Sequence, residues 1–257
     1  MYLKRKADAY LNAWKSDPNR SPLIIKGPRQ VGKTETIDYF AAHNYRSVVE
    51  INFVEEPKYR AITADGYGAN TIVRNISLID PAKKFIPGDT LIFFDEIQAH
   101  PDIATALKFF KIDGKYDVIC SGSMLGISYK QIESNSVGYK TDYEMRSLDF
   151  EEFLWARGYD EAVIESMFTH LCDATPFSEV EMNVFSTAFM DYCVLGGMPA
   201  VVASHIRTGT FEGTLQLQRQ LILDYQEDIR KYAQGPDQAR ILNVFNHIPV
   251  QLAKENK

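Results

Sequence analysis

Eight consecutive residues near the start of the chain carry the pattern of a loop that binds phosphate. They read Gly27-Pro28-Arg29-Gln30-Val31-Gly32-Lys33-Thr34 and satisfy G-x-x-x-x-G-K-[ST]. Two glycines let the backbone bend so that its N–H groups and a helix N-terminus face a phosphate. Lys33 is expected to reach the terminal phosphates, and the hydroxyl of Thr34 is expected to bind Mg²⁺. The structural alternative is a glycine-rich turn without a ligand.

A second pair of residues that could do chemistry, Asp95 and Glu96, follows a continuous apolar run over residues 90–94. Such a run predicts a central parallel strand that is buried on both faces. Its carboxyl end is the edge at which open α/β sheets bind ligands. Asp95 is therefore expected to hold Mg²⁺ through water, and Glu96 to orient and deprotonate an attacking water. The alternative is a strand that merely ends in charged turn residues.

The apolar runs and turn residues around these motifs predict the elements that position them. Residues 22–25 have strand character and a helix can start at Thr34, which gives the strand, loop, helix order that the motif requires. A short amphipathic helix is expected over residues 2–14. Further strands are expected over residues 47–53, 90–94, 116–120 and 143–148. Because strands alternate with helices at this spacing, we expect right-handed crossovers and a parallel sheet.

From Asp149 onward the pattern changes to helices only. Asp149 can cap the first of them, and apolar residues continue at helical spacing to about Tyr232. The segment 196–199 interrupts this pattern, and Gly235-Pro236 is the clearest linker. A helical subdomain is therefore expected to follow the sheet.

Composition favours an ordinary globular protein. The 257 residues are 45% hydrophobic and 24% charged, which is enough for one large or two modest cores. The apolar runs are too short to cross a membrane and no signal peptide is apparent, so a cytoplasmic location without membrane contact is expected. A net charge of −6 argues against broad electrostatic capture of nucleic acid. The three cysteines are widely spaced and predict reduced core thiols.

Five segments together resemble the large prokaryotic group of predicted AAA+ superfamily ATPases, which are similar to STAND-type and archaeal ATPases and usually carry a C-terminal domain of unknown function. These segments are G-P-R-Q-V-G-K-T at 27–34, T-L-I-F-F-D-E-I-Q at 90–98, C-S-G-S-M-L-G at 120–126, S-L-D-F-E-E-F-L at 147–154 and L-G-G-M-P at 195–199. The resemblance covers nearly the whole chain.

The resemblance implies an α/β fold with a P-loop parallel β-sheet of order 5-1-4-3-2 flanked by helices, then an α-helical lid subdomain and the start of a winged helix. It implies three parts: a P-loop ATPase domain at 1–148, a helical lid domain at 149–234 and a truncated winged-helix domain at 235–257. Because relatives continue further, the chain is expected to be an N-terminal fragment or a truncated product. Nucleic acid would then be bound only through the absent C-terminal region.

The same resemblance implies roles for further residues. Pro199 would lie against the adenine, and Gly197 would let the backbone approach the base closely. Ser121 or Ser123 would sense the γ-phosphate. The chain departs from the relatives at Tyr139, where they carry a basic residue, and at Ser147, where they carry a proline. The neighbouring Lys140 or Arg146 are the candidates for an arginine finger. The alternatives are a helix-breaking turn at Pro199, turn residues at the two serines and solvated charges beside a strand.

These interpretations predict a Mg²⁺-dependent ATP-binding protein that hydrolyses ATP to ADP and phosphate and couples its nucleotide state to lid movement. The alternative is a slowly hydrolysing nucleotide-dependent switch whose output is a contact with a protein client. A small-molecule kinase is disfavoured, since kinases of this fold usually lack the Asp-Glu pair and carry a mobile basic lid. The sequence leaves the client and the oligomeric state open.

Overall fold

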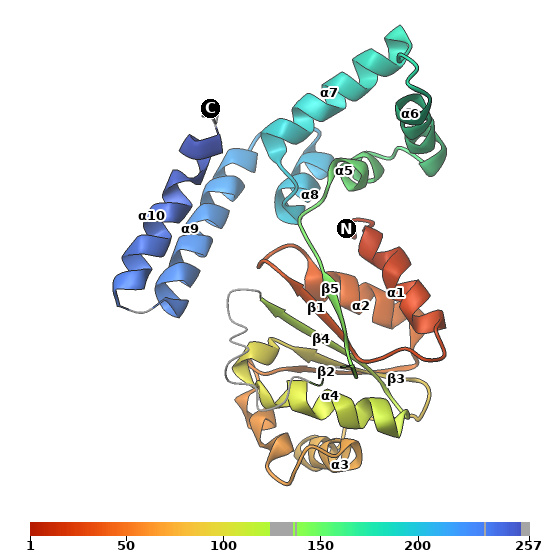
Figure 1. Cartoon of the computed structure of the whole chain (residues 1–257), viewed down its shortest axis with the longest axis vertical. Helices are drawn as coiled ribbons and strands as arrows, with labels where there is room; N and C mark the ends of the chain where they lie inside the picture. The colour runs from red at the N-terminus through yellow and green to blue at the C-terminus, as the bar shows by residue number, and fades with distance from the viewer. Residues whose placement is uncertain (124–135, 137, 234, 253–257) are drawn as a thin grey trace. The chain divides into compact units, whose positions relative to one another are not determined.

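The computed structural model describes residues 1–123, 136, 138–233 and 235–252, and a parallel five-stranded sheet lies at the centre of its first part (Figure 1). The strands are β1 (Leu23–Gly27), β2 (Ser47–Asn52), β3 (Thr90–Asp95), β4 (Asp117–Ser123) and β5 (Thr141–Glu144). Their order is β2-β3-β4-β1-β5, and every neighbouring pair is parallel. Read from β5 this is the predicted order 5-1-4-3-2, so the predicted α/β class is confirmed.

The last strand differs from its prediction over residues 143–148. It begins at Thr141 and ends at Glu144, and the pairing with β1 closes with the N–H of Met145 donating to the carbonyl of Lys26 at 2.7 Å. The N–H of Leu148 donates instead to the carbonyl of Gly197 at 2.7 Å. The strand therefore ends early because its continuation bonds to a different segment of the chain.

Helices cover both faces of the sheet, and the alternation along β3 explains why. Leu91 and Phe93 pack in the cluster that contains α1 (Lys6–Ser16) and α2 (Lys33–Asn44). Ile92 and Phe94 pack in the opposite cluster, with α3 (Ala69–Ile79), α4 (Asp102–Asp113) and the short helix η1 (Pro57–Thr63). Successive side chains of a strand point to opposite faces, so a fully apolar strand needs cover on both. Figure 1 shows the two helix layers.

Contacts divide the chain into two units, residues 1–203 and 204–257. The first unit continues after the sheet with α5 (Phe150–Ala156), α6 (Glu161–Asp173), α7 (Glu179–Leu195) and the start of α8 (Pro199–Thr208). The second unit holds α9 (Thr214–Tyr232) and α10 (Pro236–Leu252), which pack against each other. The three-part division at 148/149 and 234/235 stays a prediction.

The helical segment begins where the sequence indicates. The Asp149 side chain accepts a hydrogen bond from the Glu152 N–H at 2.9 Å, and the Glu152 side chain accepts one from the Asp149 N–H at 3.2 Å. This reciprocal capping satisfies two backbone donors at the start of α5. Leu154, Ile164 and Ala188 then form a small core that joins α5, α6 and α7.

The structure bears on two expectations from the composition. Cys120 is buried, whereas Cys172 and Cys193 are exposed, so the prediction of three core thiols is wrong for the latter two, which lie on helices rather than in the sheet. Among the described helices, none has both the length and the apolar character that crossing a membrane requires.

Candidate functional site

The predicted phosphate loop connects β1 to α2 at the carboxyl edge of the sheet. β1 ends at Gly27 and α2 begins at Lys33, so the loop runs directly into a helix N-terminus. Gly32 precedes the helix with φ 90°, a left-handed conformation that glycine adopts at little cost. Gln30 is also left-handed, at φ 62°, which costs a non-glycine residue free energy. The loop therefore has the strand, turn and helix arrangement that the pattern predicts.

The Lys33 side chain lies inside this loop. Its Nζ donates to the carbonyl oxygens of Gly27 at 3.0 Å and Pro28 at 2.7 Å, and the residue is 8% exposed. Burial lowers the pKa of Lys33 below its usual value, while the negative charges of Glu96 and Asp95 act in the opposite direction. The Lys33 ammonium group is thus held at the loop, close to Asp95 and Glu96.

Asp95 is the last residue of β3 and is buried between two neighbouring strands. Its carboxylate accepts hydrogen bonds from the hydroxyl of Ser121 on β4 and from the side-chain amide of Asn52 on β2, the latter at 3.1 Å. Asn52 is paired with Asp95 in the strand register. Both partners fix the orientation of the carboxylate at the edge of the sheet.

Ser123 differs from Ser121 in its surroundings. It is paired with Gly27 in the register of β4 and β1, so it lies beside the start of the phosphate loop. It is 1% exposed, and its hydroxyl has no hydrogen-bond partner in the described part of the chain. A buried polar group without a partner needs an explanation, and a ligand is one.

Glu96 occupies a strained position. It has φ 54° and ψ 46°, in the left-handed region, and it precedes the single turn η2 (Ile97–Ala99). Its carboxylate accepts a hydrogen bond from the side-chain amide of Gln98. Non-glycine residues in this region cluster at functional sites, where the surrounding structure maintains the strain.

Negative charge accumulates around Asp95. Burial raises the pKa of Asp38 on α2, and the charges of Asp95 and Glu35 raise it further. Burial likewise raises the pKa of Glu50 on β2, with the charges of Asp38 and Asp95 adding to the effect. A bound cation would relieve this repulsion. Thr34, the second residue of α2, is half-buried.

Pro199 lies beside the phosphate loop. A Cβ built on Gly32 would lie 3.6 Å from the Pro199 ring and 3.6 Å from the Arg5 guanidinium. Residues 27–34 and Pro199, more than 160 positions apart in sequence, therefore come together within the first unit. The close approach made by Gly197 is to another backbone segment: a Cβ there would lie 2.0 Å from the Leu148 carbonyl oxygen.

The two candidates for an arginine finger pair with acidic residues near them in sequence. Arg146 Nε lies 3.0 Å from Glu144 Oε1 in an exposed pair. Lys140 Nζ lies 2.7 Å from Asp142 Oδ1. These contacts are those of charges beside a strand, and a finger role for either residue stays a prediction.

Three residues of the site were not predicted from the sequence. Asn52 bonds Asp95, Gln98 bonds Glu96, and Arg5 contacts the phosphate loop. Asn52 has a detectable signal, since it ends an apolar-alternating strand whose carboxyl end joins the ligand edge of a parallel sheet. Arg5 has none, because it precedes an ordinary amphipathic helix in a basic segment.

Replacing Gly197 by alanine is expected to destabilise the fold by about 1–3 kcal/mol, the usual cost of inserting a methyl group where none fits. The new Cβ would overlap the Leu148 carbonyl, which is backbone and cannot rotate away. Gly68→Ala is the control, because its Cβ would have only an ordinary contact at 3.5 Å with Thr71. Urea unfolding measures both, and equal losses would contradict the steric argument.

The stability of the fold is expected to fall on acidification through His100, which follows η2. Its Nε2 lies 3.0 Å from the Thr63 hydroxyl, and its ring packs on Phe53. Burial lowers the pKa of His100 below its ordinary 6.5, with Asp102 opposing the shift and Arg60 supporting it. The unfolded chain therefore takes up a proton at higher pH than the folded one, and acid favours unfolding.

The measurement is the free energy of unfolding at pH 7.5 and at pH values below about 6.5, where an unfolded histidine gains its charge. His100→Gln should flatten the pH dependence, since a glutamine amide can reach Thr63 without titrating. His247→Gln, at an exposed histidine of α10, is the control. An unchanged slope in His100→Gln would assign the pH dependence to other groups.

Comparison with known families gives two matches. The model of a family described as "AAA domain" matches residues 19–154, more than half of the chain. A family described as "Domain of unknown function (DUF8612)" matches residues 186–257. No curated protein matches the chain. The first match spans both predicted motifs and all five strands.

The comparison with solved structures gives matches of low sequence identity. AMPPCP-bound DnaA from Aquifex aeolicus is 14% identical, with 90% of this chain and 68% of that chain covered and a TM-score of 0.43. Drosophila ORC bound to DNA is 12% identical, with 78% and 58% covered and a TM-score of 0.42. The ORC2 protein of Aeropyrum pernix, in its ADPNP-ADP complexes, is 16% identical, with 57% and 47% covered and a TM-score of 0.37. This chain spans about half the length of the Aeropyrum protein.

Proposed function

This chain belongs to the AAA domain family, and from that premise we propose that it is a Mg²⁺-dependent ATP-binding protein and an ATPase. The observation that carries the proposal is the position of Lys33. Its buried ammonium group lies within the loop at the end of β1, against the Gly27 and Pro28 carbonyls. A buried lysine beside a helix N-terminus offers fixed positive charge and N–H donors to an anion, which is what a polyphosphate requires.

The residues present fit a magnesium ion. Thr34 and Asp95 supply hydroxyl and carboxylate oxygens, the donor types that Mg²⁺ prefers, and the neighbouring charges of Asp38 and Glu50 add a negative field. When bound, the ion would neutralise charge on the phosphates. The part played by this chain is to hold Asp95 in a fixed orientation through Ser121 and Asn52.

Glu96 is the residue we assign to activation of the attacking water. It follows Asp95 directly, so its carboxylate lies at the same edge of the sheet as the loop. A glutamate acts as a general base when it can accept a proton from a water within hydrogen-bond reach of the reacting phosphorus. Lys33 would stabilise the charge that develops on the phosphate oxygens.

Ser123 is the better of the two candidates for a residue that senses the terminal phosphate. The Ser121 hydroxyl is already used by Asp95. The Ser123 hydroxyl is buried beside Gly27 and has no partner among the described residues. A hydroxyl in that state gains a hydrogen bond when a phosphate oxygen comes within reach.

A slowly hydrolysing nucleotide switch is the second candidate, and one observation favours it. The Glu96 carboxylate accepts a hydrogen bond from the Gln98 side-chain amide. A base that is held by a neighbouring side chain must first be released before it can accept a proton from water. Hydrolysis would then be limited by this release, and the bound nucleotide would persist long enough to control a contact with a protein client.

The experiment that tests the proposal has two parts. Native mass spectrometry of the purified protein identifies any nucleotide that is retained, and phosphate release with and without Mg²⁺ measures turnover. Retained ADP or ATP together with Mg²⁺-dependent release supports an ATPase. Tight binding with negligible release supports the switch, and the absence of any nucleotide affinity would contradict both.

Replacing Pro199 by alanine is expected to lower the affinities for ATP and for ADP by a similar factor of about 3–10. This is the effect of losing one apolar contact of about 1 kcal/mol. We propose that the Pro199 ring, which lies next to Gly32, packs on the base. Inorganic triphosphate lacks the base, so its affinity should not change. Calorimetry with the three ligands tests this, and a loss shared by triphosphate would place the proline against the phosphates instead.

A further inference from the structure

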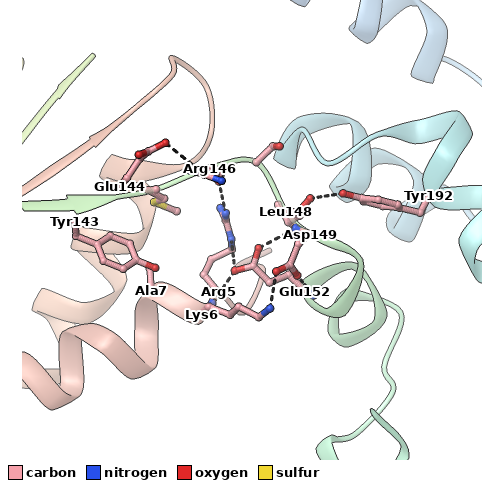
Figure 2. A pocket seen from close by; sticks show the side chains of 12 residues that line it. Arg5, Lys6, Ala7, Tyr143, Glu144, Arg146, Leu148, Asp149, Glu152 and Tyr192 are labelled. Atoms are coloured by element: carbon pink, nitrogen blue, oxygen red, sulfur yellow. Dashed lines mark hydrogen bonds and ion pairs between the residues drawn. The ribbon is translucent and has the colours of Figure 1, made fainter. Parts of the chain in front are cut away.

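Arg5 lies where several segments of the first unit meet, and its side chain contacts three of them. Figure 2 shows the contacts with Arg146 and Glu152. One guanidinium nitrogen donates to the Val31 carbonyl of the phosphate loop at 2.7 Å. The other donates to the Arg146 carbonyl after β5 at 2.6 Å. Nε lies 3.2 Å from Glu152 of α5. The side chain is 5% exposed, so these contacts replace water for a charged group.

The contact with Val31 bears on phosphate binding. A peptide unit is planar, so the Val31 carbonyl and the Gly32 N–H are fixed relative to each other. The Gly32 N–H belongs to the loop that would hold the phosphates. By anchoring the carbonyl on one side of this peptide, Arg5 determines the direction of the N–H on the other side.

Glu152 connects the same arginine to the start of α5. Its carboxylate accepts hydrogen bonds from the N–H of Lys6 at 2.7 Å and from the N–H of Asp149 at 3.2 Å, the second being the helix cap. Its side chain is 6% exposed. A buried ion pair is strongly destabilised when only one partner is displaced, so Arg5 and Glu152 are expected to move together.

The surroundings leave this pair room to move. A cavity of about 390 Å³ is lined by Arg5, Glu152, Arg146 and Tyr192, among others (Figure 2). Tyr192 of α7 donates from its hydroxyl to the Leu148 carbonyl at 2.8 Å, so the connection between β5 and α5 is tied to the helical segment as well.

We propose that Arg5 is a positioning residue that couples occupancy of the phosphate loop to the position of α5 through its ion pair with Glu152. The inference rests on the proposed function, since it needs a ligand in the loop. A ligand that draws the Gly32 N–H toward a phosphate turns the Val31 carbonyl, and the guanidinium follows it. Glu152 and the cap of α5 are then held in place with it.

The test is amide hydrogen exchange of residues 27–34 and 149–156 with and without saturating ADP, combined with affinities for ATP and inorganic triphosphate. In the parent protein ADP should slow exchange in both segments. The main variant is Arg5→Gln/Glu152→Gln, which removes both buried charges at once and avoids leaving either unpaired. In this variant ADP should still slow amide exchange in residues 27–34, but it should no longer slow exchange in residues 149–156. Its affinity for both ligands should fall about tenfold, the size of one charge-assisted hydrogen bond.

Glu152→Gln is the second variant, because it removes the charge of this side chain while Arg5 keeps its bond to Val31. The Lys6 and Asp149 N–H groups donate to different oxygens of Glu152, so the single oxygen of glutamine can keep one of these two bonds. Its affinities for ATP and triphosphate should stay within about twofold of the parent, and ADP should slow amide exchange at 149–156 less than in the parent. Lys6→Gln is the matched control. The exposed Lys6 Nζ joins the N-terminal segment to the start of α5 through ion pairs with Asp149 and Glu151, at 2.5 and 2.7 Å, without touching the phosphate loop. It should behave as the parent in both measurements.

A parent that binds no nucleotide would overturn the proposed function and this inference together. A parent that binds ADP without protection at 149–156 would overturn the inference alone. The same holds if the double variant keeps parental protection of α5. Loss of ADP-dependent protection in the variants, with Lys6→Gln unaffected, supports the coupling, because a merely structural role would change exchange equally with and without ADP.

Discussion

Replacing Lys33 by alanine is expected to abolish tight nucleotide binding, with the Kd for ATP rising at least about 100-fold. The Lys33 ammonium lies within 3.0 Å of the carbonyls of Gly27 and Pro28 at the base of the loop. The substitution removes a buried positive charge from the place where the proposed β- and γ-phosphates would gather negative charge. Charge-assisted hydrogen bonds are about twice as strong as neutral ones, and in a poorly hydrated site water replaces them badly.

Calorimetry with ATP, ADP and inorganic triphosphate measures the effect, and all three affinities should fall because the lost contact is to phosphate. Lys111→Ala is the matched control. Lys111 also donates from Nζ to two backbone carbonyls, of Asn19 and Arg20, yet it lies in the last turn of α4, at the amino end of the strands. Equal ATP affinity in Lys33→Ala and in the parent would remove the assignment of residues 27–34 as a phosphate loop.

The parts of the fold that local patterns determine could be predicted from the sequence. The apolar run before Asp95 predicts a strand that is covered on both faces, and β3 is buried along its whole length. The capping signal at Asp149 and Glu152 predicts the start of α5 correctly. Both features depend on residues close in sequence, where hydrophobic periodicity and capping chemistry act.

Features that depend on distant contacts were not predictable in the same way. β5 ends at Glu144 because Leu148 bonds Gly197, a partner 49 residues away. Arg5 joins the phosphate loop through a contact 26 residues away, and no local pattern distinguishes it from other basic residues. Ser121 and Ser123 were equivalent in sequence, and their surroundings distinguish them: the Ser121 hydroxyl donates to Asp95, whereas Ser123 lies beside Gly27 with no partner for its hydroxyl among the described residues.

Two substitutions at the end of β3 separate metal binding from proton transfer. Asp95→Asn is expected to weaken the Mg²⁺-dependent part of nucleotide binding, since it removes the charge of a carboxylate that Ser121 and Asn52 hold in place. Titration of ATP affinity against Mg²⁺ measures this. Binding that keeps its parental Mg²⁺ dependence would exclude Asp95 from the metal site.

Replacing Glu96 by glutamine is expected to keep ATP binding and to lower turnover by about 10²–10⁴, the usual contribution of a general base. The amide has nearly the same shape as the carboxylate and leaves Asp95 and Thr34 unchanged, so the ground-state complex should form normally. Phosphate release under single-turnover conditions isolates the chemical step from product release.

Gln98→Ala completes the comparison, because it removes the amide that engages the Glu96 carboxylate while leaving the carboxylate itself intact. If release of Glu96 limits hydrolysis, Gln98→Ala should turn over faster than the parent, whereas Glu96→Gln and the combined Glu96→Gln/Gln98→Ala variant should be equally slow. If Glu96→Gln hydrolyses ATP at the parental rate, Glu96 is not the base. The protein would then be better described as a nucleotide switch whose residual hydrolysis depends on other groups at the edge of the sheet.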